Sequence, residues 1–251
     1  MNPRLANRRP LTNLAGLDEA TLMGCIDHAL LRPEMTRQEV EAGVDVAIAW
    51  QTATVCCRPA DLPMVVSRLR RSVVSACTVI AFPHGTNAAS IKKREAMAAV
   101  DAGAVELDVV INFSALRSGD FGVVRDELSD LVYAVAPVPV KMILETGYLT
   151  PEQVEMACRI SLEARASFVK NGTGFSPRGA DPEEIAMMRR IVGDNVGVKA
   201  SGGIRTLDRV LAMLAAGACR VGASSTDAIG NEWRARGPEA LEALAAAGAS
   251  S

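Results

Sequence analysis

The sequence predicts a single-domain α/β protein of the (β/α)₈ barrel class. The chain has 251 residues, of which 49% are hydrophobic. That is enough apolar material for one core, and barrels of this class typically have about 250 residues. Short apolar, β-branched runs alternate with amphipathic helical stretches along most of the chain. Eight such units in one direction indicate a parallel sheet, and eight strands close this type of barrel.

Each expected strand is a short apolar run bounded by polar or glycine-containing sequence. In chain order, we expect strands over residues 24–28, 53–57, 76–82, 105–111, 140–145, 167–170, 196–200 and 219–222. An open, doubly wound sheet is the alternative fold, and it requires a glycine-rich fingerprint after the first strand. The sequence there, DHALLRP, contains no glycine, which favours the closed barrel.

Helical stretches with recognisable start and stop signals separate these runs. We expect helices near residues 37–50, 60–71, 88–102, 121–135, 151–165, 182–193, 206–217 and 237–247. Thr150-Pro151 and Asp181-Pro182 are typical N-caps followed by proline, and glycine follows the helical runs at Gly103 and Gly217. Residues 1–20 are expected to form an N-terminal arm, and residues 21–251 the barrel domain.

Composition argues against several classes of partner and cofactor. The net charge of −2 and the 4% aromatic content give no electrostatic or stacking reason to expect nucleic acid. No apolar run has the ~18 residues needed to span a membrane. The six cysteines show no CxxC pair and the two histidines no ligand spacing, so we expect no metal and no cofactor. Reduced, buried cysteines and the lack of a signal peptide predict a cytoplasmic protein.

Two lysines carry most of the functional information. Lys170 and Lys199 each follow a short β-branched run and precede glycines, and about 30 residues, the length of one strand–helix unit, separate them. On neighbouring strands, both ammonium groups would enter the same barrel mouth. Like charges in a partly desolvated site favour the neutral form of one of them. A neutral amine attacks carbonyl groups, so the pair predicts Schiff-base chemistry.

Acidic residues alternate with apolar ones in the run VELDVVIN. Glu106 and Asp108 share one face, and buried carboxylates there require partners, which lysines at the same mouth would supply. The same alternation places Lys141 and Glu145 on one face of VKMILE, where a structural ion pair is the simplest interpretation. Asp27 is expected to close the first strand, either as a turn residue or as part of the site.

Glycine-rich loops follow the last two expected strands. The first has the sequence SGGIR and contains Gly202, Gly203 and Arg205, and the second begins at Gly222 and continues to Ser224 and Ser225. Barrel enzymes commonly bind phosphate with the loops after strands seven and eight. Glycine lets backbone N–H groups approach the phosphate oxygens, and the two serines would open a short helix whose N-terminus favours an anion.

Taken together, these motifs resemble the deoxyribose-phosphate aldolases, a class I aldolase family. The motifs CIDHALLRP, ATVCCRP, VIAFPHG, AVELDVVIN, VKMILETGYL, FVKNGTGF, VGVKASGGIRT and RVGASS lie in the order and spacing of that family, from about residue 24 to residue 225. The resemblance implies a metal-free barrel without cofactor. It implies reversible cleavage of 2-deoxy-D-ribose 5-phosphate to acetaldehyde and D-glyceraldehyde 3-phosphate.

The resemblance also assigns roles by position. It implies that Lys170 forms the Schiff base, that Lys199 tunes it, and that Asp108 transfers protons through a water. It implies that Asp27 supports Lys199. The remaining positions of the substrate and phosphate site are Thr173, Gly174, Gly202, Gly203, Arg205, Gly222, Ser224 and Ser225.

Three departures from the family pattern leave the substrate open. The usual KTSTG reads Lys170-Asn171-Gly172-Thr173-Gly174, the usual DHTLL has Ala29, and the chain does not end in tyrosine. Alternatives are a class I aldolase for another aldehyde or phosphosugar, a sugar-phosphate isomerase that forms no imine, and a non-catalytic phosphosugar-binding barrel. Partners are expected to be small phosphorylated sugars and aldehydes, in a homodimer or larger homo-oligomer.

Overall fold

Within the described residues, eight parallel strands close into a barrel in chain order, as the sequence predicts. The structure is a computed structural model, and it describes residues 8–11 and 14–248. Each strand pairs with its sequence neighbours, and the last pairs with the first. The strands are β1 (Ile26–Leu30), β2 (Thr54–Cys57), β3 (Ser75–Ile80), β4 (Glu106–Val110), β5 (Val140–Ile143), β6 (Phe168–Lys170), β7 (Gly197–Ser201) and β8 (Arg220–Ala223).

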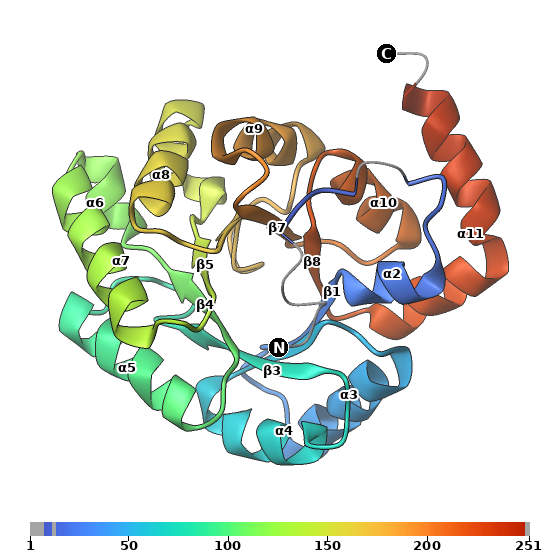
Figure 1. Ribbon diagram of the computed structural model, residues 1–251, viewed down its shortest axis with the longest axis horizontal. Helices are drawn as coiled ribbons and strands as arrows, with labels where there is room; N and C mark the ends of the chain where they lie inside the picture. The colour runs from blue at the N-terminus through green and yellow to red at the C-terminus, as the bar shows by residue number, and fades with distance from the viewer. Residues whose placement is uncertain (1–7, 12–13, 249–251) are drawn as a thin grey trace.

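Helices surround the strands as an outer ring (Figure 1). Two single 3₁₀ turns, η1 (Pro59–Asp61) and η2 (Thr146–Tyr148), lie in loops after strands β2 and β5. The helices are α2 (Glu19–Gly24), α3 (Arg37–Trp50), α4 (Leu62–Leu69), α5 (Ala89–Asp101), α6 (Phe113–Ser118), α7 (Phe121–Val135), α8 (Pro151–Glu163), α9 (Pro182–Val192), α10 (Leu207–Ala215) and α11 (Thr226–Gly248).

The boundaries of several helices follow from local sequence. Thr36 and Thr150 each form a reciprocal capping box with the residue three positions later, which satisfies backbone donors at the helix start. Asp181 caps α9 by accepting from the backbone of Glu183 and Glu184. These caps set the starts of α3, α8 and α9 at the positions expected from the sequence.

The element boundaries predicted from the sequence differ from the structure at both ends of the chain. Strand β1 begins two residues later than expected, because residues up to Gly24 belong to α2, which Asp18 caps. Asp27 is therefore the second residue of β1 and not its end. Residues 19 and 20 of the expected arm belong to α2, and residues 1–7 lie outside the described residues.

The last helix is also longer than expected. Helix α11 runs from Thr226 to Gly248 and contains a kink, with Arg236 in a non-helical conformation just before Pro238. Proline favours such breaks, which explains why the sequence indicated two separate pieces, a short helix opened by Ser224 and Ser225 and a second helix near residues 237–247. The second half of α11 extends away from the ring (Figure 1).

The lumen of the barrel is closed at one level by an aromatic side chain. Phe168 on β6 is fully buried, and its ring lies 5.5 Å from the Arg220 guanidinium and 5.9 Å from Lys141 Nζ. Gly197 on β7 makes room for this ring, because a Cβ there would lie 2.1 Å from a Phe168 ring carbon. The phenylalanine thus forms a floor beneath the charged residues of the lumen.

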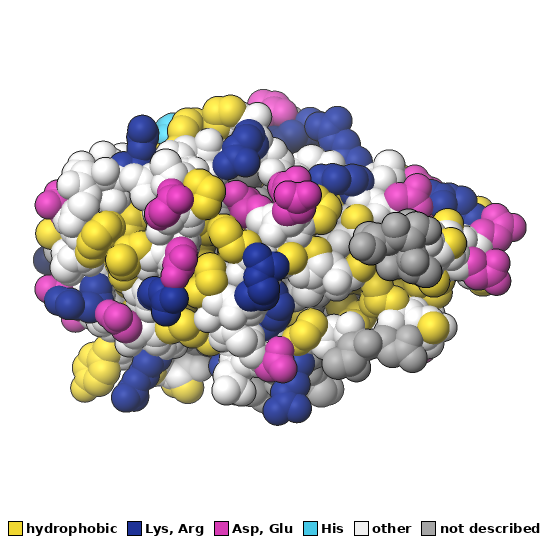
Figure 2. All heavy atoms as spheres, turned by 90° about the horizontal axis from the view of Figure 1, so that it is seen from above, with side chains coloured by type: hydrophobic (Ala, Val, Ile, Leu, Met, Phe, Trp, Pro, Cys, Tyr) yellow, Lys and Arg dark blue, Asp and Glu magenta, His cyan; other side chains and the backbone are white. Residues whose placement is uncertain are grey.

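The outer surface mixes charges of both signs. On the face shown in Figure 2, Lys and Arg side chains are interspersed with Asp and Glu. Among the described residues, no helix combines the length and the apolar character required to cross a bilayer.

Candidate active site

Strands β6 and β7 bring the two predicted lysines side by side. Lys170 and Lys199 are register partners, so their side chains enter the lumen from adjacent positions. Both ammonium groups contact the same oxygen, Oδ2 of Asp108 on β4, at 2.8 Å from Lys170 Nζ and 2.7 Å from Lys199 Nζ. The two nitrogens are therefore no farther apart than the sum of these distances.

Asp27 holds the opposite side of Lys199. Its Oδ2 lies 2.5 Å from Lys199 Nζ, and its Oδ1 accepts hydrogen bonds from Thr54 Oγ1 and Arg220 Nη1, each at 2.7 Å. A carboxylate with these partners is fixed in orientation. Arg220 was not identified from the sequence, although it lies two residues before Gly222 and therefore on the same face of β8.

Lys141 pairs differently from the sequence-based interpretation. Its Nζ lies 2.6 Å from Glu106 Oε2 and 2.9 Å from Asp108 Oδ1. Glu145 lies beyond the end of β5 with a left-handed backbone (φ 59°), and its Oε1 accepts from the Thr173 N–H at 3.2 Å. The expected ion pair between Lys141 and Glu145 is wrong, because strand alternation stops at Ile143.

The lumen therefore contains a connected group of ionisable side chains, which we call the charged centre. It comprises three acidic and four basic residues, none more than 2% exposed: Asp27, Glu106, Asp108, Lys141, Lys170, Lys199 and Arg220. Such burial is tolerated only because each charge has opposite charges in contact. Glu106 Oε1 is the one buried side-chain oxygen or nitrogen without a hydrogen-bond partner among the described residues.

Mutual pairing decides the charge states of the centre. Burial alone would raise the pKa of Asp108, but Lys141, Lys170 and Lys199 outweigh it and hold the pKa well below its usual value. Burial would likewise lower the pKa of Lys199, but Asp108 and Asp27 outweigh it and raise the pKa. Asp108 is consequently a carboxylate and Lys199 an ammonium group at neutral pH.

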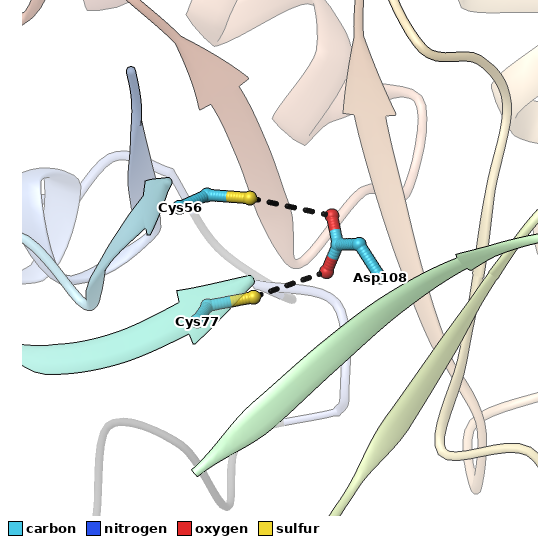
Figure 3. Close-up of side chains that lie close together, drawn as sticks. All are labelled: Cys56, Cys77 and Asp108. Carbon is cyan, nitrogen blue, oxygen red and sulfur yellow. Dashed lines mark hydrogen bonds between the residues drawn. The ribbon is translucent and has the colours of Figure 1, made fainter. Parts of the chain in front are cut away.

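Two thiols contact Asp108 from the other side of the lumen (Figure 3). Cys77 on β3 donates to Asp108 Oδ1 at 3.3 Å, and Cys56 on β2 donates to Oδ2 at 4.0 Å. Both cysteines are buried and are register partners on adjacent strands. No histidine contacts either one among the described residues, so the arrangement lacks the base of a cysteine nucleophile.

Asn171 ties the end of β6 to the end of β7. Its side-chain amide donates to the Ser201 carbonyl at 3.1 Å and accepts from the Ser201 N–H at 2.8 Å. Ser201 Oγ in turn donates to the Gly172 carbonyl at 2.6 Å. The departure from the family's KTSTG pattern thus builds a bridge between the strands that carry Lys170 and Lys199.

A cavity of about 290 Å³ opens above the charged centre. Its lining includes Lys170, Lys199 and Asp27 at the bottom, whereas Asp108 lies beneath the lysines and does not line it. Every residue of the predicted substrate set except Ser225 lines the same cavity: Thr173, Gly174, Gly202, Gly203, Arg205, Gly222 and Ser224.

The upper wall of this cavity is made largely of backbone. Gly202 and Gly203 have left-handed φ values of 99° and 72°, which glycine adopts without strain. A Cβ on Gly202 would lie 3.2 Å from the Gly179 Cα of the neighbouring loop. Ser225 stands directly before α11, where its carbonyl accepts from Ile229. The exposed side chains of Arg205 and Arg32 complete the mouth.

Three larger hollows lie elsewhere among the described residues. One of about 560 Å³ lies between Leu14 and α11, one of about 690 Å³ lies beside α6 and η2, and one of about 400 Å³ lies between η2 and α9. None of them is lined by the buried lysines that chemistry on a carbonyl compound requires. The smaller cavity above the charged centre is therefore the candidate active site.

The fold and this site define a lyase of the class I aldolase type. The chain belongs to the DeoC/LacD family of aldolases, whose family model matches residues 21–232. It is 46% identical over 211 residues to a deoxyribose-phosphate aldolase of Thermoanaerobacter sp. (strain X514), covering 83% of this chain and 95% of that protein. It is 43% identical over 220 residues to a deoxyribose-phosphate aldolase of Rhodospirillum rubrum, covering 88% and 92%.

Solved structures agree with this assignment. The deoxyribose-phosphate aldolase of Aeropyrum pernix, described as a tetramer, superposes with a TM-score of 0.81 at 30% identity, covering 86% of this chain and 92% of that one. An aldolase called QR15 superposes with a TM-score of 0.82 at 37% identity, covering 88% and 98%.

Proposed function

We propose that this protein cleaves 2-deoxy-D-ribose 5-phosphate reversibly to acetaldehyde and D-glyceraldehyde 3-phosphate through a Schiff base on Lys170. The observation that supports it best is the shared contact of Lys170 and Lys199 with Asp108 Oδ2, directly beneath the cavity. This contact places an amine, an acid and a base within reach of one bound carbonyl carbon.

Lys170 is the proposed nucleophile. Its amine adds to the C1 aldehyde, and the resulting carbinolamine loses water to give the imine. Lys170 lines the cavity, so its nitrogen reaches substrate from below. Lys199 is held charged by Asp108 and Asp27, and it can donate a proton to the carbinolamine hydroxyl, which then leaves as water.

Asp108 is the proposed proton acceptor for cleavage. The protonated imine withdraws electrons, so the C2–C3 bond breaks as the C3 hydroxyl proton leaves, which yields the two-carbon enamine and the three-carbon aldehyde. Asp108 lies below the lysines and not on the cavity wall, so we infer that a water carries this proton. Protonation of the enamine and hydrolysis then release acetaldehyde.

The phosphate is proposed to bind at the glycine-lined mouth. Gly202, Gly203 and Ser224 line the cavity there, and Arg205 supplies a positive charge. None of the described residues pairs with Arg205. Because this anion site lies at the mouth and Lys170 at the bottom of the cavity, a phosphate bound there would orient the aldehyde end of the sugar toward Lys170.

Borohydride trapping tests the proposal. Wild-type protein with 2-deoxyribose 5-phosphate and sodium borohydride should gain the mass of a reduced adduct, whereas Lys170→Ala should not. Lys93→Ala, which removes a surface lysine paired with Asp130, serves as the matched control and should be labelled normally. Equal cleavage rates in wild type and Lys170→Ala would refute the proposal.

A second candidate is an aldolase of the same mechanism for a different aldehyde or phosphosugar. Asn171, Gly172 and Ala29 depart from the family pattern, and Ala29 lines the cavity. A panel of aldehyde acceptors and phosphosugars, compared by kcat/KM, separates the two. We also propose that residues 1–20 form an arm and that residues 21–251 form the barrel domain. We further propose that the protein is cytoplasmic and forms a homodimer or larger homo-oligomer. Light scattering would measure this oligomeric state.

A further inference from the structure

Three metal-ligating side chains meet inside the barrel, beside the proposed reaction centre. Cys56, Cys77 and Asp108 come from the adjacent strands β2, β3 and β4, and their side chains converge on one point (Figure 3). One ligand atom from each lies within 4.8 Å of the others, and all three residues are buried. The cysteines are separated widely in sequence, so their spacing along the chain gave no sign of this group.

We propose that Cys56, Cys77 and Asp108 form an inhibitory binding site for a soft divalent metal ion such as Cd²⁺ or Zn²⁺. Soft and borderline cations prefer thiolate ligands, and two cysteines with one carboxylate are a suitable donor set for either ion. The proposed reaction uses neither cysteine, so the site is additional to it.

The spacing of the three side chains is close to that of a bound ion. With Zn–S near 2.3 Å and Zn–O near 2.0 Å, a tetrahedral ion separates sulfur from oxygen by about 3.5 Å. The observed separations are 3.3 Å from Cys77 Sγ to Asp108 Oδ1 and 4.0 Å from Cys56 Sγ to Asp108 Oδ2, so each sulfur faces a different oxygen of the same carboxylate. A rotation of the Asp108 carboxylate that presents one oxygen to both sulfurs would complete three of the four positions, and a water can fill the last.

The surroundings can accept the ion without a change in net charge. Starting from two thiols, coordination of one divalent ion releases two protons to solvent. Lys141 Nζ lies 3.4 Å from Cys77 Sγ and can donate to the new thiolate. If Asp108 Oδ1 turns to the metal, Lys141 loses its 2.9 Å contact there but keeps Glu106 at 2.6 Å.

An entry path also exists. Cys56 lines the cavity above the charged centre, so an ion that enters the mouth meets this sulfur first. Cys77 and Asp108 lie behind it. Once bound, the ion would coordinate the Asp108 carboxylate and prevent it from accepting a proton during cleavage, which would inhibit the enzyme. This expected inhibition rests on the proposed aldolase function.

Cadmium titration tests the site independently of activity. Cd²⁺ added to the reduced, full-length protein should produce a thiolate-to-cadmium charge-transfer absorption that saturates at one ion per chain. The same ion should abolish aldolase turnover, and a chelator should restore both. Cys77→Ala should lose the absorption and weaken the inhibition by more than about 100-fold, measured against its own metal-free rate.

Cys57→Ala is the matched control, because Cys57 is a buried cysteine on β2, beside Cys56, but does not belong to the group. It should bind Cd²⁺ like wild type. Equal absorption in Cys77→Ala and wild type would overturn the site. Absorption with full turnover would overturn Asp108 as a ligand. A protein that shows the cysteine-dependent absorption but cleaves no sugar phosphate would retain the site and refute the proposed function instead.

Discussion

The active site has two levels, the charged centre at the bottom and the mouth of the cavity above it, and they are built in opposite ways. In the charged centre, every ionisable side chain is buried and contacts an opposite charge, and the groups come from six of the eight strands that the structure describes. At the mouth, the lining includes four glycines, and Arg205 is exposed with no partner among the described residues. The charged centre is fixed by its own ion pairs, whereas in the proposed function the substrate phosphate supplies the partner at the mouth.

This difference matches two tasks of the proposed reaction, proton transfer in the charged centre and phosphate binding at the mouth. Groups that move protons need fixed positions and fixed charge states, which the mutual ion pairs of the centre provide. A phosphate needs donors and a positive charge that lose little when no ligand is bound, which backbone N–H groups and a solvated arginine provide. Substitutions in the centre should therefore change the rate of reaction, and substitutions at the mouth should change substrate affinity.

The largest expected effect comes from Asp108→Asn. It removes the carboxylate shared by Lys170 and Lys199, and kcat should fall by about 10²–10⁴-fold, the usual contribution of an acid–base group. Trapping with borohydride should persist, since imine formation does not need this base. Circular dichroism should establish that the variant is folded. If trapping disappears together with turnover in a folded variant, the division of roles between the lysines and Asp108 is incorrect.

Arg205→Ala tests the mouth. The phosphate would lose one charged partner, so KM should rise by about tenfold, equivalent to about 1.4 kcal/mol, while kcat changes little. Arg117→Ala is the control, because Arg117 is exposed on α6 and does not line the cavity. An equal rise of KM in both variants would show that general surface charge, and not contact at the mouth, is responsible.

Asn171→Ala examines the link between the two levels. It leaves the Ser201 N–H and carbonyl without their amide partner, which should reduce the free energy of unfolding by about 1–3 kcal/mol. Because Ser201 begins the glycine loop, KM and kcat should change together. Asn171→Thr restores the family's usual residue. Denaturant unfolding and steady-state kinetics measure both properties, and unchanged stability in Asn171→Ala would exclude a structural bridge.

A dependence of stability on pH, with no direct effect on catalysis, is expected from a residue outside both levels. Burial lowers the pKa of His28 to about 4, while the unfolded chain protonates near 6.5. The unfolded state therefore binds the proton first, and stability should fall as pH drops from 6.5 towards 4, by up to about 3 kcal/mol. Asp27 and Asp108 contribute only below this window, because their pKa values are lowered from 3.8.

Thermal unfolding between pH 5 and pH 7 measures this loss. His28→Asn should unfold with a flatter pH dependence, since its amide can replace the 2.8 Å hydrogen bond between His28 Nδ1 and Thr226 Oγ1 without binding a proton. The same slope in both proteins would assign the acid sensitivity to other groups.

The barrel could be predicted because each unit carries its own local signals. Apolar runs recur eight times, N-caps such as Thr150 and Asp181 and glycine stops such as Gly103 and Gly217 mark several of the helices between them, and the number of units indicates closure. Helices α2 and α6 were missed, because each has six residues and is too short to show an apolar period. The start of α11 was expected only as a short helix opened by Ser224 and Ser225. A break at Pro238 hid the continuity of α11.

The site was predictable only in part, for a related reason. Lys170 and Lys199 lie on consecutive strands, so strand alternation places them together. Arg220, which binds Asp27 across the closure between β8 and β1, and the pairing of Cys56 and Cys77 with Asp108 depend on barrel stagger. No local pattern encodes that stagger, so these contacts required the three-dimensional structure.

The Phe168 floor has a kinetic consequence. With the ring of Phe168 packed against Lys141 and Arg220, we expect substrate and products to pass through the mouth of the cavity, which the described residues line with Gly202, Gly203 and Arg205. In the proposed reaction the two-carbon fragment stays bound to Lys170 at the bottom, behind the phosphorylated fragment. The phosphorylated aldehyde would then have to leave before water can release the fragment attached to the lysine, and synthesis would have to load the two aldehydes in the reverse order.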